Sequence, residues 1–479
     1  MICLCKRPWL LLVYGLLCSC AVGPDYSAPD TVVPDLWAQQ LEQEAQLENA
    51  PMQDWWAVFE DETLTSLIER SHTRNLSIQR LAQRVGEFRM TLAIARSEKF
   101  PAVSGTGSAE RSRGSDGVAA APPPQSRTDT FRELGATASW EVDLWGRVRR
   151  SVESALASYE SSIEDLRDIQ VSVYAQVATE YLTLRTLQER LVLAKANVDI
   201  QRGTLKIVEA RYEAQLTPLL DVRQAEQNLF QTLSVIPDIE ASIESSLFRL
   251  SVLLGELPNA LSEELGVASP LPELPDAHGI SAPANTVRQR PDIRSAERQL
   301  AAQTAQIGVA IADLYPNFFL FGDFAYSTVT GPIVDRSNRS WGIGTFFSWN
   351  LFNAGRVRSN VKAEEFRTQQ ALLNYEETVL DALREVEESL ISYIKEKEKA
   401  DFLANSVVAA IDAEQLVTDQ YRQGLTNFQN VLDTQRSLFD RQDQLATSQG
   451  TALINLVSVY RAMGGGWAAL PEVQVENPK

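Results

Sequence analysis

Two regions of the chain alternate between apolar and polar residues with a period of two. Side chains along a β-strand point to opposite faces in turn, so this pattern predicts strands with one apolar and one polar face. In the first region, the polar positions that alternate with the apolar ones include Glu133, Thr137 and Ser139. In the second region, NFFLFGDFAYS and WGIGTFFSWNLF carry aromatic residues at many of the apolar positions. The predicted strands cover about 102–113, 130–145, 317–330 and 340–353.

This alternation fits two kinds of sheet. It is typical of a transmembrane barrel strand, with apolar side chains toward lipid and polar ones toward the lumen, and equally of a half-buried sheet in a soluble protein. The aromatic residues in the strands and an export signal favour the barrel. Four strands are too few to enclose a lumen, and an open edge in lipid leaves backbone groups unpaired. A barrel therefore requires several chains, and three chains would supply twelve strands.

A long helical pattern follows each strand pair. The second runs from about Arg356 to Arg422 without Pro or Gly, which corresponds to on the order of 100 Å of helix. Gly424 and Pro218 mark turns, after which each helix returns as an antiparallel partner, and Pro237 predicts a kink or a break in the first return. Apolar residues recur every three or four positions, and Glu and Lys occupy many of the positions between them. This pattern indicates solvated coiled coils. The predicted hairpins cover about 147–254 and 356–461.

The chain also repeats itself. SWEVDLWGRVRRSV begins at Ser139 and SWNLFNAGRVRSNV begins at Ser348, 209 residues later. RYEAQLTPLLDVRQAEQNLF and QYRQGLTNFQNVLDTQRSLF match at the same offset, which aligns Tyr212 with Tyr421. Two separated matches at one offset indicate two long structural units and not a solenoid. We predict repeat 1 at 76–255, a Pro-rich linker at 256–290, repeat 2 at 291–461 and a C-terminal tail at 462–479.

The N-terminus has the order of a bacterial export signal. Lys6 and Arg7 precede an apolar run that is too short to span a bilayer, and small residues follow it. Leu17, Cys18 and Ser19 before Cys20 resemble a lipobox, which predicts a lipoprotein signal peptide at 1–19 and a lipid on the Cys20 thiol. An ordinary signal peptide cleaved elsewhere is the alternative. With the lipid on Cys20, residues 20–75 would form a lipidated N-terminal segment and an equatorial part.

Composition narrows the classes of function. The net charge of −19 disfavours nucleic acid as a partner, and the four cysteines all lie within the first twenty residues, so the mature chain has no internal disulfide. His72 and His278 have no carboxylate or cysteine at ligand spacing, so we expect both on the surface and no metal site. No nucleophile motif is present. The sequence thus predicts a protein that is not an enzyme and carries no cofactor apart from the lipid.

Several long motifs resemble those of one family. CAVGPDYSAP, WWAVFEDETLTSLIE, RPDIRSAERQLAAQTAQIGVAIADLYPNF, LDTQRSLF and MGGGW look like segments of the outer-membrane efflux lipoproteins, the TolC-like channels of tripartite export systems. The likeness covers nearly the whole mature chain, in order. It implies a mixed α and β fold: a homotrimeric, twelve-stranded transmembrane barrel continuous with a long periplasmic α-helical barrel of coiled-coil hairpins.

The resemblance also implies a function and a location. The protein would be a passive exit duct for drugs or other toxic small molecules, anchored by lipid in the outer membrane and extending into the periplasm. Its partners would be a periplasmic adaptor and an inner-membrane pump. A lipid-anchored structural coiled-coil protein or a periplasmic adaptor are the alternatives, but the first leaves the aromatic strands unexplained. An adaptor would have one hairpin between β-rich domains.

Two sets of site residues follow from the resemblance. An Asp at the position of Asp433 faces the closed periplasmic end of the tunnel in this family, and residues matching Arg436 and Tyr421 tie neighbouring helices. Spacing alone indicates only an Asp433–Arg436 ion pair on a solvated helix. The helix turns would contact the adaptor, although Gly at a helix end and Thr as the next N-cap is the simpler interpretation. These turn residues are Leu216, Thr217, Gly424, Leu425 and Thr426.

One departure from the family pattern lies at the first turn. The sequence reads QLTPLL there and GLTNFQ at the second turn, whereas the family often has Gly-Leu at both. The sequence therefore does not determine the geometry of the first turn. The Gly-, Pro- and Ser-rich stretch 111–129 joins two predicted strands and is interpreted as an external loop.

Overall fold

The computed structural model describes residues 21–30, 53–113, 128–274, 288–329 and 331–470. Cys20, the signal peptide, His278 and most of the 111–129 loop lie outside these residues. The chain forms two compact units. Unit 1 comprises Met1–Asp30, Val85–Ser162 and Ser295–Tyr375, and unit 2 comprises Thr31–Arg84, Ile163–Arg294 and Glu376–Lys479.

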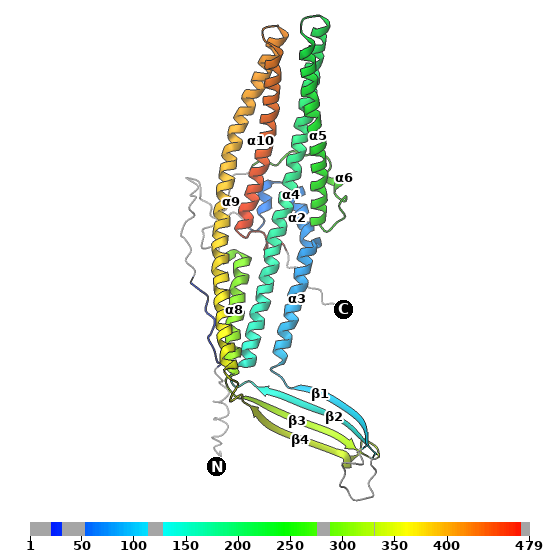
Figure 1. Ribbon diagram of the computed structural model, residues 1–479, viewed down its shortest axis with the longest axis vertical. Helices are drawn as coiled ribbons and strands as arrows, with labels where there is room; N and C mark the ends of the chain where they lie inside the picture. Colours follow the sequence, from blue (N-terminus) through cyan, green and yellow to red (C-terminus); the bar gives the residue numbers. More distant parts are fainter. Residues whose placement is uncertain (1–20, 31–52, 114–127, 275–287, 330, 471–479) are drawn as a thin grey trace, which may run out of the picture. The chain divides into compact units, whose positions relative to one another are not determined.

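Unit 1 contains a four-stranded antiparallel sheet in the order β1-β2-β3-β4 (Figure 1). The register places Val142 opposite Phe318, and Phe318 opposite Phe347. Because alternate residues share a face, the apolar positions of the separate strands form one apolar face. Polar residues lie on the other face, where the hydroxyl groups of Ser104 and Thr137 are 3.2 Å apart. The strands are β1 (Ala102–Arg113), β2 (Thr128–Val142), β3 (Asn317–Thr328) and β4 (Arg339–Ser348).

β1 has the predicted bounds, whereas the other three strands end earlier than their sequence pattern suggests. β2 ends at Val142 because the next residue, Asp143, turns to cap the following helix. Its carboxylate accepts hydrogen bonds from the backbone N–H groups of Val148 and Arg149, at 3.1 and 3.0 Å. An acidic group at this position satisfies amide groups that have no partner within the first helical turn.

Tryptophan side chains connect the sheet of unit 1 to the helices that precede it. Trp140 Nε1 donates to the carbonyl of Lys99, and Trp349 Nε1 donates to the carbonyl of Leu314, both at 3.1 Å. The two tryptophans are 209 residues apart, the offset found in the sequence. Each therefore fixes the base of a strand pair to the end of a helix.

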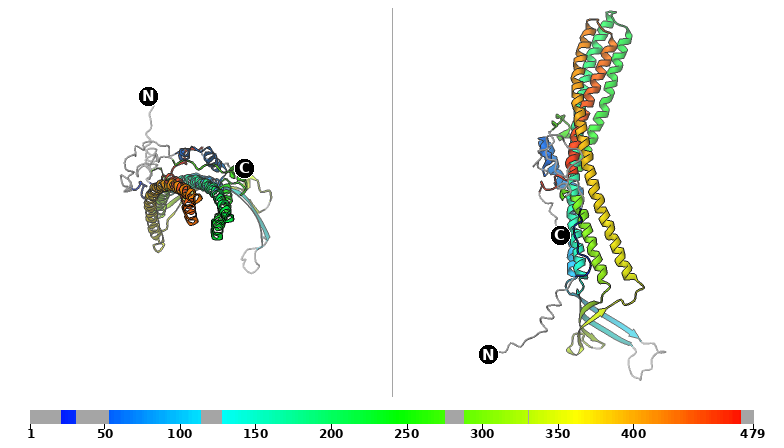
Figure 2. Two further views of the ribbon diagram at one scale, coloured as in Figure 1. Left: turned by 90° about the horizontal axis from the view of Figure 1, so that it is seen from above. Right: turned by 90° about the vertical axis from the view of Figure 1, so that its left-hand side faces the viewer.

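Four helices have residues in both units, and unit 2 adds two return helices (Figures 1 and 2). The return helices are α5 (Leu219–Leu253) and α10 (Phe428–Ala462). They run antiparallel beside α4 (Arg147–Glu213) and α9 (Arg356–Arg422), respectively. Within the described residues, no helix combines the length and the apolar composition needed to cross a bilayer. The helices that pass through both units are α3 (Leu76–Ser97), α4, α8 (Pro291–Ala312) and α9. Unit 2 also has α2 (Glu62–Arg74) and α6 (Ser262–Leu265), and short 3₁₀ turns lie at η1 (Trp55–Phe59) and, in unit 1, η2 (Arg336–Asn338).

The structure bears on two expectations from the sequence in unit 2. Of the kink or break predicted at Pro237, the break does not occur, because helix α5 is continuous through this residue. The helix keeps its apolar face packed on both sides of the proline, with Thr232 and Ile239 buried, and this packing offsets the lost backbone hydrogen bond. His72 is buried and not on the surface. It lies on the packed face of α2, where its Nδ1 is 2.6 Å from the hydroxyl of Tyr174.

A polar pocket of about 210 Å³ in unit 2 joins the start of α8 to α9 and α10. Arg290 is buried in it and donates to the carbonyl of Ala462 at 2.5 Å, to Asp292 at 2.6 Å and to Glu385 at 3.0 Å. Asp168 of α4 lines the same pocket. Burial raises the pKa of the Asp168 carboxyl to about 6, and the nearby Asp292 carboxylate acts in the same direction.

This raised pKa predicts a pH-dependent stability. The folded state holds a proton on Asp168 that the unfolded chain releases near pH 4, so the free energy of unfolding should fall as the pH rises from about 4 to 6. Replacing Asp168 by Asn should remove this dependence and stabilise the protein at pH 7.5 by up to about 3 kcal/mol. Urea unfolding at pH 4 and pH 7.5 measures the effect. Asp238→Asn, at an exposed site, is the control, and equal shifts in both variants would contradict the assignment.

Candidate functional site

The two helix turns of unit 2 have the same backbone geometry. Gln215 and Gly424 both adopt a left-handed conformation, with φ of 60° and 76°. In each turn the amide of the next residue, Leu216 or Leu425, donates to the carbonyl five residues earlier at 2.8 Å. This is the hydrogen-bond pattern of a Schellman C-cap. The first turn therefore keeps the geometry of the second, although a glutamine stands where the second turn has glycine.

The threonines do not act as the N-caps that the sequence suggested. The N-cap residues are Pro218 for α5 and Asn427 for α10, and the Asn427 side chain accepts from the amide of Asn430 at 3.1 Å. The left-handed residue and the two that follow it complete each turn before the next helix begins, so the cap lies one residue beyond Thr. Thr217 instead bonds to the Asp221 carboxylate, and Thr426 accepts from the Asn430 side chain.

Both turns expose a leucine at the same position. Leu216 is 67% exposed and Leu425 is 72% exposed, while the neighbouring threonines are half-buried. Exposed leucines at the tips of two hairpins are available to a partner and contribute nothing to the core.

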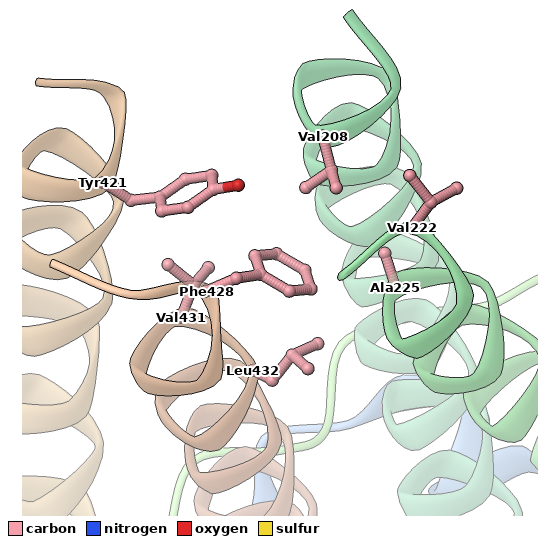
Figure 3. Close-up of a cluster of buried hydrophobic side chains, with 7 residues drawn as sticks. All are labelled: Val208, Val222, Ala225, Tyr421, Phe428, Val431 and Leu432. Carbon is pink, nitrogen blue, oxygen red and sulfur yellow. The ribbon is translucent and has the colours of Figure 1, made fainter. Parts of the chain in front are cut away.

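A buried apolar cluster behind the turns joins the two hairpins (Figure 3). It takes side chains from all four helices of the hairpins, and the rings of Tyr421 and Phe428 are 5.4 Å apart between centroids. The cluster therefore fixes the end of each hairpin against the other within one chain. Its members are Val208, Val222, Ala225, Tyr421, Phe428, Val431 and Leu432.

Arg211 of α4 holds Tyr421 in this cluster. Its guanidinium lies 4.7 Å from the centre of the tyrosine ring, and Nη1 donates to the Tyr421 carbonyl at 3.0 Å. The carbonyl is near the C-terminal end of α9, where a positive charge is favourable. Burial raises the pKa of the Tyr421 phenol, although Thr217 and Arg211 act in the opposite direction. Sequence reasoning found Tyr421 and missed Arg211.

Asp433 and Arg436 do not form the local ion pair that their spacing suggests. Arg436 Nε donates to the side-chain oxygen of Asn228 on α5 at 2.8 Å, and so ties the two hairpins together. Asp433 is exposed and accepts from Gln429 at 2.9 Å. The arginine reaches across to the other hairpin, which leaves the carboxylate on the free surface of this chain.

Further polar contacts join α4 and α10 along the hairpins. Gln435 donates to Thr204 at 2.8 Å, Asn197 donates to Gln442 at 2.9 Å, and Arg190 pairs with Asp443 at 2.7 Å. The α4 residues 190, 197, 204 and 211 follow a spacing of seven, which keeps them on one face in a coiled coil. This spacing is a signal in the sequence that could have revealed the contact face.

Comparisons with known proteins agree with this architecture. Residues 67–256 and 282–465 match the family model described as outer membrane efflux protein. The chain is 29% identical over 454 residues to nodulation protein T of Rhizobium leguminosarum bv. viciae, a match that spans 95% of this chain and 92% of that protein. It is 30% identical over 466 residues to the solvent efflux pump outer membrane protein SrpC of Pseudomonas putida, which covers 95% and 97% of the two chains.

Solved structures show the same fold. The outer-membrane channel OprN aligns with a TM-score of 0.86 and 32% identity, over 94% of this chain and 100% of that chain. The open state of the MtrE outer membrane channel of Neisseria gonorrhoeae aligns with a TM-score of 0.81 and 23% identity, over 94% and 99% of the two chains. At the lower identity the likeness concerns the fold alone.

Because Gln215 adopts a left-handed conformation, replacing it by glycine and replacing Gly424 by glutamine should have opposite effects on the stability of their turns. Gln215→Gly should stabilise the first turn by about 1 kcal/mol, because a residue with a Cβ is strained at this φ, and Gly424→Gln should destabilise the second by a similar amount. Hydrogen exchange of the turn amides measures both. Ala214→Gly is the control, because it adds glycine beside the left-handed position, and it should weaken the turn. Equal protection in Gln215→Gly and Ala214→Gly would contradict the prediction.

Proposed function

The chain belongs to the outer membrane efflux protein family, and on this premise we propose that it forms the exit channel of a tripartite export system. It is an outer-membrane efflux channel protein and not an enzyme. In the proposal, an inner-membrane pump delivers drugs or other toxic small molecules through a periplasmic adaptor, and the channel lets them leave passively. The observation that carries the proposal is the family match over residues 67–256 and 282–465.

We further propose that three chains close one barrel. β1 and β4 are the edges of the four-stranded sheet, and the apolar and polar faces are separated as in a membrane barrel. Pairing β1 of each chain with β4 of the next would satisfy both edges and give twelve strands. The matching hydrogen bonds of Trp140 and Trp349 and the matching turns support two structural repeats in each chain.

A lipid on Cys20 would anchor the same region of the protein. The Cα of Ala21 packs against Gly146, where a Cβ would come within 2.8 Å, and the amide of Val22 donates to the carbonyl of Trp145 at 3.0 Å. These contacts place Ala21, the residue after the proposed lipidation site, near the end of β2. That position suits an anchor in the membrane that the strands would cross.

Export can be tested together with the role of the turns. Deleting the gene should increase susceptibility to a broad panel of toxic compounds, and the wild-type gene should restore resistance. A variant with Leu216→Asp and Leu425→Asp should not restore it, because charges replace the exposed leucines proposed to contact the adaptor. Its trimer should still reach the outer membrane, as a membrane fraction run on a gel without heating would show.

Leu257→Asp provides a matched control, because this leucine is 76% exposed but lies away from the turns. It should restore resistance as the wild type does. A deletion strain with unchanged susceptibility would argue against the export function, and full rescue by the double variant would argue against the turns as the adaptor contact.

The turns would also form the gate of the channel. In a trimer, three copies of Asp433 would converge on the axis and repel one another unless cations compensate them. The Arg436–Asn228 and Arg211–Tyr421 contacts would hold the helices in the narrow arrangement. We therefore assign Asp433 to a constriction ring and Arg436 and Tyr421 to the ties.

Conductance in planar bilayers tests this gate. Asp433→Ala should raise conductance or weaken the preference for cations, and Arg436→Ala combined with Arg211→Ala, which removes the contacts to Asn228 and Tyr421, should raise the open probability. Asp440→Ala is the matched control, because this exposed carboxylate lies on the same helix two turns farther from the Gly424 turn. Wild-type conductance, selectivity and gating in all the gate variants would show that the assignment is wrong.

A further inference from the structure

The polar face of the sheet in unit 1 carries a small aromatic cluster. The rings of Phe319 and Phe346 are stacked with centroids 4.9 Å apart, and Phe321 lies 6.0 Å from Phe346. The register pairs Phe319 with both Glu141 and Phe346, so the three rings share a face with polar residues of β2. Phe318 and Phe347 belong to the opposite, apolar face.

This cluster is exposed and is not part of a core. Phe321 is 40% exposed and Phe346 is 50% exposed. Packing toward lipid does not explain the rings, because the lipid-facing positions of the proposed barrel are on the other side of the sheet. A contiguous group of apolar side chains rimmed by polar residues is typical of interaction sites and ligand-binding grooves.

Two glycines of β4 make room for the cluster and for a carboxylate beside it. A Cβ on Gly344 would lie 2.6 Å from the Phe321 ring, and a Cβ on Gly342 would lie 2.6 Å from the Asp323 carboxylate. Glycine inside a strand weakens it, and its use here permits this close approach. Asp323 is exposed and forms no ion pair with any part of the chain that the structure describes.

We propose that Phe319, Phe321, Phe346 and Asp323 form a transit site for organic cations that carry an aromatic or other apolar group. The proposal rests on the proposed channel, in which this face lines the lumen. Aromatic faces attract cations, and the carboxylate, about 7 Å along the strand from Phe321, adds a complementary charge. Two exposed rings, the half-buried ring of Phe319 and one carboxylate give weak binding, as a passive duct requires, because the cargo must also leave.

Current block in planar bilayers tests the transit site on the full protein. Benzyltriethylammonium should produce brief, concentration-dependent reductions in current through the wild-type channel. Tetraethylammonium, which lacks the ring, and benzenesulfonate, which has the opposite charge, should block much less. Phe321→Leu with Phe346→Leu keeps both side chains apolar but removes the aromatic faces, and it should weaken the block by benzyltriethylammonium about two- to fivefold per ring. Asp323→Asn should weaken it further.

Glu133→Gln is the matched control. Glu133 lies on β2, on the same face of the sheet as Asp323 but away from the rings, so the substitution also removes one carboxylate from this face. It should leave the block unchanged. An equal block in the wild type and the leucine variant, or an equal effect of Glu133→Gln and Asp323→Asn, overturns the transit site alone. A protein that inserts into the bilayer but conducts no ions, even when Arg436→Ala loosens the proposed gate, overturns the proposed channel and the transit site with it.

Discussion

Backbone hydrogen bonding at the two edges of the sheet is the constraint on which the proposed assembly depends. β1 and β4 each present a row of amide and carbonyl groups that no other strand of the described chain pairs. In water this is tolerable, but in lipid each unpaired group costs several kcal/mol. In the barrel proposed above, the open edges of each chain therefore require neighbouring chains to pair with them.

Periodicity in the sequence was enough to predict where the strands and long helices lie, because patterns of two and of three to four repeat over many residues. It did not predict where elements end. Asp143 continues the alternation of β2, but its carboxylate caps α4 instead. Tertiary packing sets a similar limit at His72, which is buried against the rest of the fold, and at Pro237, where the helix continues without the break that was one of the two predicted outcomes.

The candidate gate shows which contacts a sequence leaves undetermined. Family resemblance identified Tyr421 and Arg436, but their partners Arg211 and Asn228 lie about 210 residues earlier in the chain. No local spacing connects such residues, and the one local pair that spacing did suggest, Asp433 with Arg436, is not formed. At the turns, the αL position of Gln215 was also not predictable, because glycine is the usual residue there.

The faces of β3 illustrate why a register is needed to assign function. Phe318, Phe319, Leu320 and Phe321 are consecutive apolar residues, so this strand alone does not reveal which rings face lipid and which face the lumen. The neighbouring β2 alternates cleanly, and its pairing places Val142 beside Phe318 and Glu141 beside Phe319. A shift by one residue would exchange the two faces. The clear pattern of one strand thus assigns the faces of the other, and it places three phenylalanines on the side where a cargo would pass.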